Sequence, residues 1–303
     1  MSGPQVEAIQ LHELACWRVR VAGSELLITQ QGAQILSYRQ SQSQPPVIWL
    51  SPQAAYERGQ GVRGGVPVCW PWFGALQGNP QAVQAMVTPG QEAPFHGLVR
   101  TLDWQLGEIE EQADSVLLQF SFNSQTQPLA IWPHAAELTL RVRLSAEHLS
   151  IELITRNLGT TTLAISQALH TYFAVSDIRQ VSIEGLEGCE YVDTLADWQI
   201  FEQQGAVDFT GETDRIYQNT PAQLHIVDAA WNRKISLVSR ASASAIVWNP
   251  WIEKAKRLSQ FAYNDWQGML CIEHANVLKD VQKLVPGAEH CLALEISSGV
   301  ISG

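Results

Sequence analysis

The sequence has few charged residues, and cations are the scarcer kind. Charged side chains make up 16% of the 303 residues, and 19 lysines and arginines against 30 aspartates and glutamates leave a formal charge of −11. A typical soluble domain has about 25% charged residues. No lysine precedes Lys234. This balance argues against nucleic acid or an anionic membrane as a partner, and an anionic ligand would need a local cluster of cations.

Cysteine pairs and membrane-spanning runs are also missing. The five cysteines are an odd number, are widely scattered and form no CxxC, which favours free thiols in a reducing cytosol over disulfides or a zinc site. The opening MSGPQVEAIQLHELACW lacks the basic and apolar segments of a secretory signal, and no run of about 18 apolar residues occurs. We therefore expect a cytoplasmic monomer with no membrane partner.

The common cofactor and metal motifs are absent. The sequence contains no GxGxxG, GxxxxGK[ST] or GxSxG, and no histidine pair spaced as HxH or HExxH. The glycine tract in GVRGGVPVCWPWFG cannot open a helix at once because prolines follow it. We expect no nucleotide, no metal and no cofactor, which leaves acid/base chemistry or binding without chemistry.

Period-two alternation of apolar residues is the dominant pattern. In ELTLRVRL, residues 137–144, every second side chain is apolar, and short runs such as WRVRV, LSIELI and KISLVS repeat the pattern between turn-forming clusters. Such runs are typical of antiparallel sheets with one buried face. SPQAAYERG, residues 51–59, is the one candidate for a short helix.

No break in composition divides the chain. We predict an all-β protein with one domain over residues 1–303, a large antiparallel β-sandwich with a cleft on one sheet, in which the first fifteen or so residues are peripheral. The longest non-periodic stretch, residues 74–94, directly follows the glycine- and tryptophan-rich segment. A long loop in a compact domain is usually functional or mobile.

Two ionisable residues lie inside apolar, strand-like runs. His170 occurs in LAISQALHTYFAV and Glu273 in MLCIEHAN. Glutamate is almost never fully buried unless it is paired. Each residue has two interpretations: His170 is a satisfied core histidine or an acid/base group above small neighbours, and Glu273 forms a structural ion pair or faces a cleft. His274 would point to the opposite face of its strand.

Arg63 and Arg100 are the only arginines or lysines between Gly59 and Leu140, and both lie in glycine-containing, aromatic-rich segments. An arginine fork matches phosphate or carboxylate geometry. Trp70 and Trp72 could supply an apolar wall for a sugar. The alternative is that the arginines form structural ion pairs and the tryptophans belong to the core.

Two further polar residues occur in turn-like contexts. His96 lies in PFHGLVR, and Asp214 lies in TDRIY directly after TGE. Asp214 could equally cap a turn and pair with Arg215. From the residues alone, the sequence predicts a cytosolic β-sandwich with a possible carboxylate–imidazole pair and an arginine anion site.

Seven motifs occur in one order: RGGVPVCWPWFG, HGLVRTLDW, WPH, ALHTYFAV, TDRIY, WNP and CIEHA. In this combination the chain resembles the hexose-6-phosphate mutarotases, also called glucose-6-phosphate 1-epimerases, a branch of the aldose 1-epimerase, galactose-mutarotase-like superfamily. The resemblance extends from about Val19 to about Ile296. It implies a single antiparallel β-supersandwich with an open sugar cleft.

The resemblance also implies an acid/base pair. His170, in LHTYF, corresponds to the general acid, and Glu273, in CIE, corresponds to the general base. The implied reaction interconverts the α and β anomers of a hexose 6-phosphate, most simply glucose 6-phosphate, by opening and reclosing the ring. It needs Glu273 ionised and His170 protonated, and we expect each charge to support the other.

Four substrate contacts follow from the same resemblance. Arg63 and Arg100 match the arginines that bind the sugar phosphate, His96 matches a histidine near the reacting centre, and Asp214 matches an aspartate that contacts sugar hydroxyls. Phe95 departs from the family pattern, because some relatives have a polar residue before the His-Gly pair.

Two other functions remain open from the sequence. One is an aldose 1-epimerase that acts on free hexoses such as galactose, which would not need the arginine pair. The other is a non-catalytic carbohydrate-binding β-sandwich, which would not need both His170 and Glu273.

Overall fold

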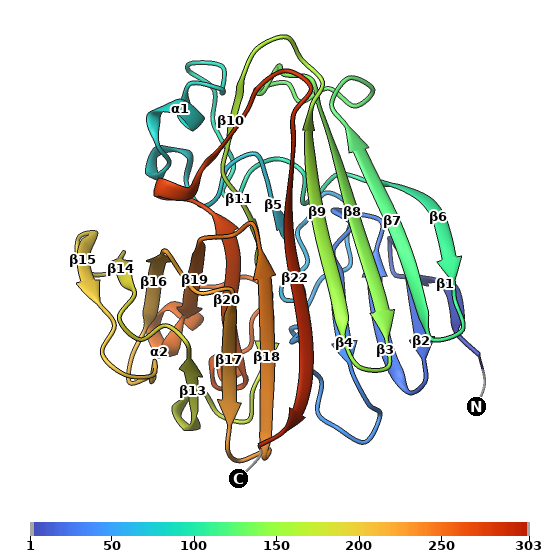
Figure 1. Ribbon diagram of the computed structural model, residues 1–303, viewed down its shortest axis with the longest axis vertical. Helices are drawn as coiled ribbons and strands as arrows, with labels where there is room; N and C mark the ends of the chain where they lie inside the picture. The colour runs from blue at the N-terminus through green and yellow to red at the C-terminus, as the bar shows by residue number, and fades with distance from the viewer. Residues whose placement is uncertain (1–2, 302–303) are drawn as a thin grey trace.

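The computed structural model describes residues 3–301, and antiparallel strands make up most of it (Figure 1). Two eight-stranded sheets and a four-stranded sheet dominate, and β10 (Leu163–Ile165) pairs with β21 (Gln282–Leu284) as a separate ribbon. The all-β prediction is therefore confirmed. No helix in the described part of the chain is long and apolar enough to cross a membrane.

The first large sheet, called here the site sheet, has the strand order β15-β14-β16-β19-β20-β11-β5, and β12 also pairs with β20. Its strands are β5 (Val68–Cys69), β11 (Gln167–Leu169), β12 (Tyr172–Ala174), β14 (Glu190–Asp193), β15 (Gln199–Glu202), β16 (Thr213–Gln218), β19 (Ser244–Asn249) and β20 (Met269–Asn276).

The second large sheet has the order β13-β17-β18-β22-β9-β8-β7-β6. Its strands are β6 (Gln105–Glu111), β7 (Ser115–Asn123), β8 (Ala136–Ser145), β9 (Leu149–Asn157), β13 (Val181–Glu184), β17 (Gln223–Asp228), β18 (Arg233–Arg240) and β22 (Glu289–Val300). The alternation predicted for residues 137–144 is observed in β8, where every second residue is buried.

The N-terminal residues form the four-stranded sheet, in the order β1-β2-β3-β4. Its strands are β1 (Gln5–Leu11), β2 (Leu14–Val21), β3 (Ser24–Thr29) and β4 (Ile35–Arg39). This sheet lies behind β7 and β8 in Figure 1, with β2 and β3 in contact with β8. The first strand pairs with β2 along its whole length, so it forms the edge of this sheet.

Helical segments are few and short. They are η1 (Leu76–Gly78), α1 (Gln81–Gln84), η2 (Ile178–Gln180), α2 (Trp251–Ala255), η3 (Asp265–Gly268) and η4 (Leu278–Asp280). The short helix expected over residues 51–59 is absent, because that stretch forms turns. The loop predicted over residues 74–94 contains η1 and α1.

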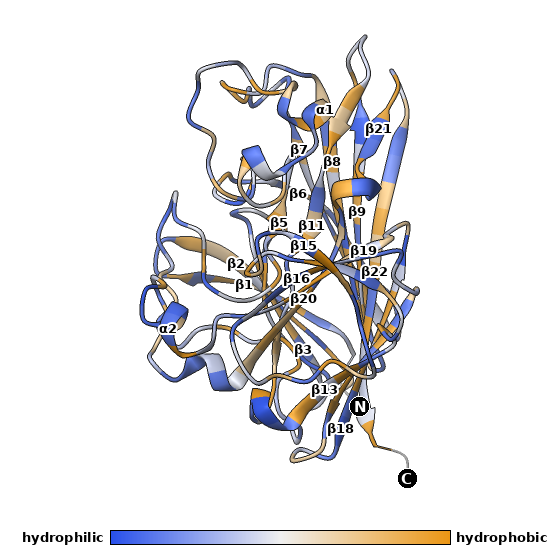
Figure 2. Cartoon of the chain, turned by 90° about the vertical axis from the view of Figure 1, so that its left-hand side faces the viewer, coloured by the Kyte–Doolittle hydropathy of each residue, from blue (hydrophilic) through white to orange (hydrophobic). Residues whose placement is uncertain are grey.

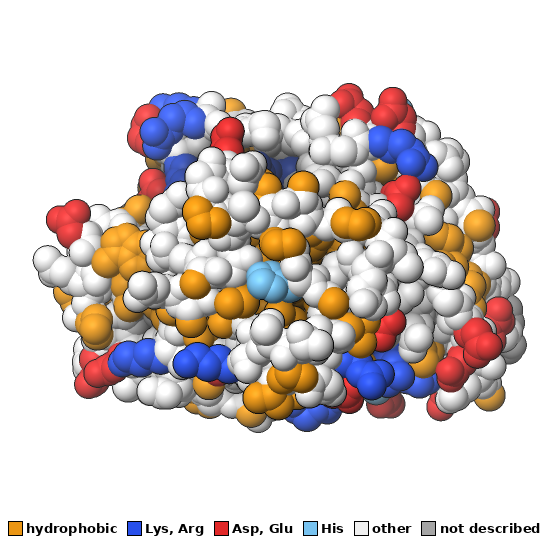
Figure 3. All heavy atoms as spheres, turned by 90° about the horizontal axis from the view of Figure 1, so that it is seen from above, with side chains coloured by type: hydrophobic (Ala, Val, Ile, Leu, Met, Phe, Trp, Pro, Cys, Tyr) orange, Lys and Arg blue, Asp and Glu red, His pale blue; other side chains and the backbone are white. Residues whose placement is uncertain are grey.

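Apolar residues concentrate inside the sandwich and charges lie outside it. In Figure 2 the first half of β20 has hydrophobic colours, as its sequence MLCI requires, whereas α2 is mostly hydrophilic. Seen from above, the Lys, Arg, Asp and Glu side chains gather toward the margins and the centre of the face is mostly uncharged (Figure 3).

Candidate active site

Strand register brings the candidate site residues onto one face of the site sheet. Asp214 of β16 pairs with Trp248 of β19, which pairs with Cys271 of β20, which in turn pairs with Tyr172 of β12. Directly paired residues of antiparallel strands point to the same face, as do residues two apart in one strand. Glu273 therefore points the same way as this row.

This face forms the floor of a cavity of about 300 Å³. That volume lies at the lower end of the range for small-molecule sites. All six residues singled out from the sequence line it, although their segments are far apart in the chain. The lining residues are Arg63, Phe73, Phe95, His96, Arg100, His170, Tyr172, Asp214, Ile246, Trp248, Lys254, Leu258 and Glu273.

His170 lies at a break between two strands. The single strand expected through LAISQALHTYF is divided into β10, β11 and β12, and His170 falls between β11 and β12. Its backbone N–H donates to the carbonyl of Pro67 at 3.0 Å instead of to a partner in β20. The break brings the imidazole parallel to the ring of Tyr172, with 4.9 Å between ring centroids.

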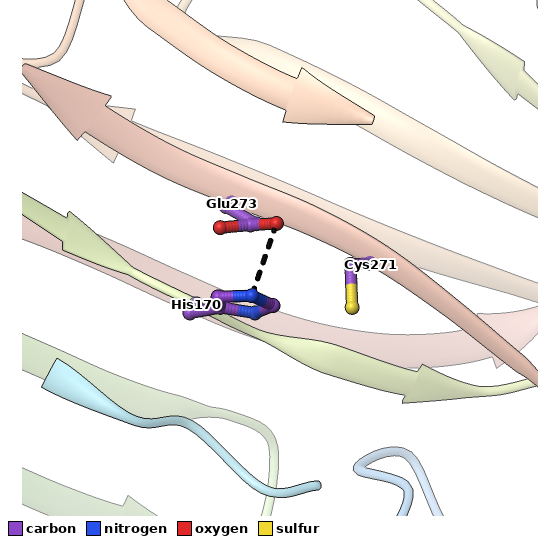
Figure 4. Close-up of side chains that lie close together, drawn as sticks. All are labelled: His170, Cys271 and Glu273. Carbon is purple, nitrogen blue, oxygen red and sulfur yellow. Dashed lines mark ion pairs between the residues drawn. The ribbon is translucent and has the colours of Figure 1, made fainter. Parts of the chain in front are cut away.

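Nε2 of His170 lies 3.4 Å from Oε1 of Glu273 (Figure 4). The two residues are only 8% and 2% exposed. Nδ1 of His170 and Oε2 of Glu273 are buried and have no hydrogen-bond partner among residues 3–301. Buried polar atoms are normally satisfied, so these two groups are better placed to exchange protons with a ligand than to stabilise the core.

Burial shifts the pKa values of this pair against the charge states expected from the sequence. Burial lowers the pKa of His170 to about 3, assisted by the nearby cations of Arg100 and Arg63. Burial also raises the pKa of Glu273 well above its usual range, assisted by the carboxylate of Asp214. Both shifts disfavour the charged forms, because desolvation outweighs the mutual support that the sequence suggested.

The backbone fixes the tautomer of His96. The N–H of Gly74 donates to Nδ1 of His96 at 3.2 Å, and burial lowers the pKa of the ring well below its usual range. The imidazole is therefore neutral and carries its proton on Nε2. Its centroid lies 5.1 Å from that of His170. The next residue, Gly97, has φ of 78° and approaches the carbonyl of Trp70 too closely for a Cβ atom.

Arg63 and Arg100 stand beside a second, smaller cavity of about 70 Å³, which His96, His170 and Tyr172 also line. Arg63 donates to the hydroxyl of Tyr172 at 3.4 Å, and Arg100 donates to the carbonyl of Phe95 at 2.8 Å. No carboxylate among residues 3–301 lies within 4.0 Å of either guanidinium. The alternative of structural ion pairs is therefore wrong for both arginines within the described residues.

Asp214 lies at the opposite side of the large cavity, beside a lysine that sequence reasoning missed. Nζ of Lys254 lies 3.9 Å from Oδ2 of Asp214. It lies closer, at 3.3 Å, to Oε1 of Glu212. Burial raises the pKa of Asp214, and Lys254 opposes that shift. The WNP motif that precedes Lys254 was the only signal in this region, and Trp248 of that motif lines the cavity.

The tryptophans of the opening glycine-rich segment do not form a sugar wall. Trp70 and Trp72 are both fully buried, and neither lines the cavity. Their core interpretation is the correct one, and Phe73, Phe95 and Trp248 supply the aromatic surface instead. Phe95, the departure from the family pattern, is 59% exposed and adds an apolar ring to the lining of the cavity.

The catalytic candidates also form a group that could hold a metal ion, although no motif predicted one. Ligand atoms of His170, Cys271 and Glu273 all lie within 4.8 Å of one another. Cys271 is fully buried.

The fold matches solved structures over its whole length. A crystal structure of the YeaD protein of Salmonella typhimurium has a TM-score of 0.86 and 29% sequence identity, and the match covers 97% of this chain and 94% of that one. A galactose mutarotase-like protein of Clostridium acetobutylicum shares the fold at a TM-score of 0.77 and 14% identity, with 99% of each chain covered. The fold is thus that of the galactose-mutarotase-like proteins.

The sequence places the chain more narrowly. Residues 16–297 match the aldose 1-epimerase family, and the chain belongs to this family. An Escherichia coli protein named "Putative glucose-6-phosphate 1-epimerase" is 33% identical over 246 residues, which is 81% of this chain and 77% of that protein. A protein of Cenchrus ciliaris with the same name is 32% identical over 267 residues, or 85% and 76% of the two chains.

Proposed function

We propose that this protein interconverts the α and β anomers of a hexose 6-phosphate, with glucose 6-phosphate as the first candidate. The observation that carries the proposal is the position of Arg63 and Arg100, two guanidinium groups without carboxylate partners among the described residues, around a small cavity next to His170. A volume of about 70 Å³ holds about two water molecules or one phosphoryl group. The relatives named above support the same substrate.

The acid/base step follows from the 3.4 Å contact between His170 and Glu273. Ionised Glu273 removes the proton of the C1 hydroxyl while protonated His170 donates one to the ring oxygen. The C1–O5 bond breaks as the C1–O1 double bond forms. Rotation about C1–C2 presents the other aldehyde face, and the same two groups then return their protons as the ring closes.

The neutral pair that burial favours is one of the two working states of this cycle. Neutral His170 with protonated Glu273 holds as many protons as the ion pair, and it is the form that remains after ring opening. In that form Glu273 donates to the aldehyde oxygen and His170 accepts the proton of the O5 hydroxyl, so burial favours the form that recloses the ring.

The phosphate of the substrate would favour the other working state, in which Glu273 is ionised and His170 is protonated. The cations of Arg100 and Arg63 help to lower the pKa of His170. A phosphate dianion between them would offset that effect and favour the imidazolium needed for ring opening. His96, as a neutral Nε2–H donor, and Asp214, as an acceptor, would hold hydroxyls of the sugar.

The test is an anomer-resolved exchange assay by proton NMR, run on glucose, galactose and mannose with and without the 6-phosphate. The proposal expects exchange above the enzyme-free rate for at least one 6-phosphate and much weaker acceleration of the free sugars. Equal acceleration of galactose and its 6-phosphate would support a free-hexose epimerase, and no acceleration of any sugar would support a non-catalytic binding protein.

We also propose that the protein works in the cytoplasm. All five cysteines are free thiols, and three of them are buried. Free cysteines are the normal state in a reducing compartment, and hexose phosphates are intracellular metabolites.

A further inference from the structure

The thiol of Cys271, a soft metal ligand, lies directly beside the proposed acid/base pair of His170 and Glu273. Cys271 precedes Glu273 by two residues on β20, so both side chains leave the same face of the strand. His170 approaches from the break between β11 and β12, and Figure 4 shows the three side chains turned toward a common space. Their ligand atoms lie within 4.8 Å of one another, and all three residues are buried.

The spacing of these atoms is close to that around a tetrahedral metal ion. Zinc binds sulfur at about 2.3 Å and nitrogen or oxygen at about 2.0–2.2 Å, which puts tetrahedral ligands about 3.3–3.8 Å apart. The 3.4 Å between Nε2 of His170 and Oε1 of Glu273 already falls in this range. Small changes in side-chain torsion angles that move the sulfur of Cys271 by about 1 Å would bring its distances into this range as well.

We propose that His170, Cys271 and Glu273 form an inhibitory site for a thiophilic divalent cation, such as Zn²⁺ or Cd²⁺. The inhibition rests on the proposed function, because the metal would occupy the two atoms that exchange protons with the sugar. Binding forms metal–sulfur, metal–nitrogen and metal–oxygen bonds, and it releases to water the thiol proton of Cys271 and the carboxyl proton of Glu273.

The chemistry of the three ligands selects the metal. One thiolate, one imidazole and one carboxylate suit zinc, cadmium or cobalt, whereas magnesium and calcium require oxygen ligands. Residues 3–301 supply three ligands to this group, and His170 and Glu273 border the 300 Å³ cavity, so a fourth position is open to water. The net charge of −11 favours cations near the protein, while Arg63 and Arg100 weaken binding at the site itself.

Inhibition of the full chain by metal chlorides tests the proposal. Protein treated with a chelator is assayed with micromolar Zn²⁺ or Cd²⁺ and, in parallel, with Mg²⁺ or Ca²⁺. The proposal expects loss of epimerase activity with the first pair only, and recovery on renewed chelation. Each variant is compared with its own metal-free rate, so that small effects of the substitution itself do not enter.

The matched variants are Cys271→Ala and Cys69→Ala, since both cysteines are fully buried in the site sheet and only Cys271 belongs to the cluster. Loss of an outer partner of a metal ligand typically weakens binding by about 10–100-fold, so loss of the ligand Cys271 should raise the inhibitory zinc concentration at least tenfold. Cys69→Ala should behave like the wild type. Equal zinc sensitivity of both variants and the wild type would overturn the proposal.

Cobalt gives a measurement that does not depend on activity. Co²⁺ added to the wild type should produce a sulfur-to-cobalt charge-transfer band in the near ultraviolet and raise the thermal midpoint, because the ion binds only the folded site. The band should persist in Cys69→Ala. Its absence from the wild type overturns the metal site even if the protein is an active epimerase, whereas a band in an inactive protein supports the site and contradicts the proposed function.

Discussion

The imidazole of His170 lies parallel to the ring of Tyr172, 4.9 Å away and with 9° between the ring planes. The hydroxyl of Tyr172 in turn accepts a hydrogen bond from Arg63. A continuous path of contacts thus links the small cavity between the arginines to the group proposed as general acid. Under the proposed function, this path would connect the binding of the sugar phosphate with proton transfer at His170.

Replacement of either member of the acid/base pair should abolish most catalysis. Glu273→Gln and His170→Asn keep the approximate shape of the side chains but remove the group that accepts or donates the proton, so the exchange rate on glucose 6-phosphate should fall by roughly 10²-fold or more. The measurement is proton NMR exchange on variants whose far-ultraviolet circular dichroism matches the wild type. A variant with a near wild-type rate would show that its residue is not catalytic.

The same Glu273→Gln variant should be more stable than the wild type at alkaline pH. Burial raises the pKa of Glu273 in the folded protein, so folding takes up a proton between the unfolded pKa of about 4.3 and the raised folded pKa. Stability from this group is therefore lost as the pH rises through the folded pKa. Glutamine does not titrate, so the variant should gain about 1–2 °C in Tm for each kcal/mol recovered.

Thermal melts at pH 5 and pH 8 measure this effect. The difference in Tm between Glu273→Gln and the wild type should be larger at pH 8. His170 contributes in the opposite sense, because its lowered pKa removes stability as the pH falls from about 6.5 toward 3, but it is common to both proteins. A difference that shrinks between pH 5 and pH 8 would contradict a raised pKa of Glu273 in the folded protein.

Arg63 should discriminate between phosphorylated and free sugars. A hydrogen bond to a charged group contributes about 1.5–3 kcal/mol, so Arg63→Ala should lower the ratio of kcat/KM for glucose 6-phosphate over glucose by roughly 10–150-fold. Lysine at this position should restore only part of the ratio, because it lacks the planar fork.

The control is Arg58→Ala, which removes the same charge from an exposed arginine that pairs with Asp103 at 3.0 Å. It should leave the ratio near the wild-type value. An unchanged ratio in Arg63→Ala would mean that Arg63 serves only its contacts with Tyr172 and the carbonyl of Ser259.

A free oxyanion should activate the enzyme toward unphosphorylated glucose. The cations of Arg63 and Arg100 help to hold the pKa of His170 at about 3, and a dianion in the 70 Å³ cavity would reduce their effect and allow His170 to become protonated. Sulfate is the suitable probe, since it is a weaker base than phosphate and catalyses mutarotation less by itself. The enzyme-dependent rate on glucose should rise with sulfate at constant ionic strength.

Arg63→Ala should lose most of this activation. If sulfate leaves the wild-type rate on glucose unchanged, or slows it, the small cavity does not couple anion binding to the acid/base pair.

Several features of the protein could be predicted from the sequence because they depend on local patterns. Alternation at residues 137–144 predicted β8 and its buried face, and similar runs predicted an all-β chain. An ionisable residue in an apolar run is also a local signal, and it identified His170 and Glu273 before their mutual distance was known. The scarcity of cations likewise drew attention to Arg63 and Arg100.

Only the tertiary structure decided how these residues meet and in which charge state. Trp70 and Trp72 are core residues and Lys254 lines the cavity, because burial depends on which strands pair and not on the neighbours in sequence. The sequence suggested that the charges of His170 and Glu273 support each other, whereas burial shifts both pKa values toward the neutral forms, since desolvation depends on the whole surrounding fold. In the sequence, Cys271 is one of five scattered cysteines, and only the pairing of the strands places it beside His170 and Glu273.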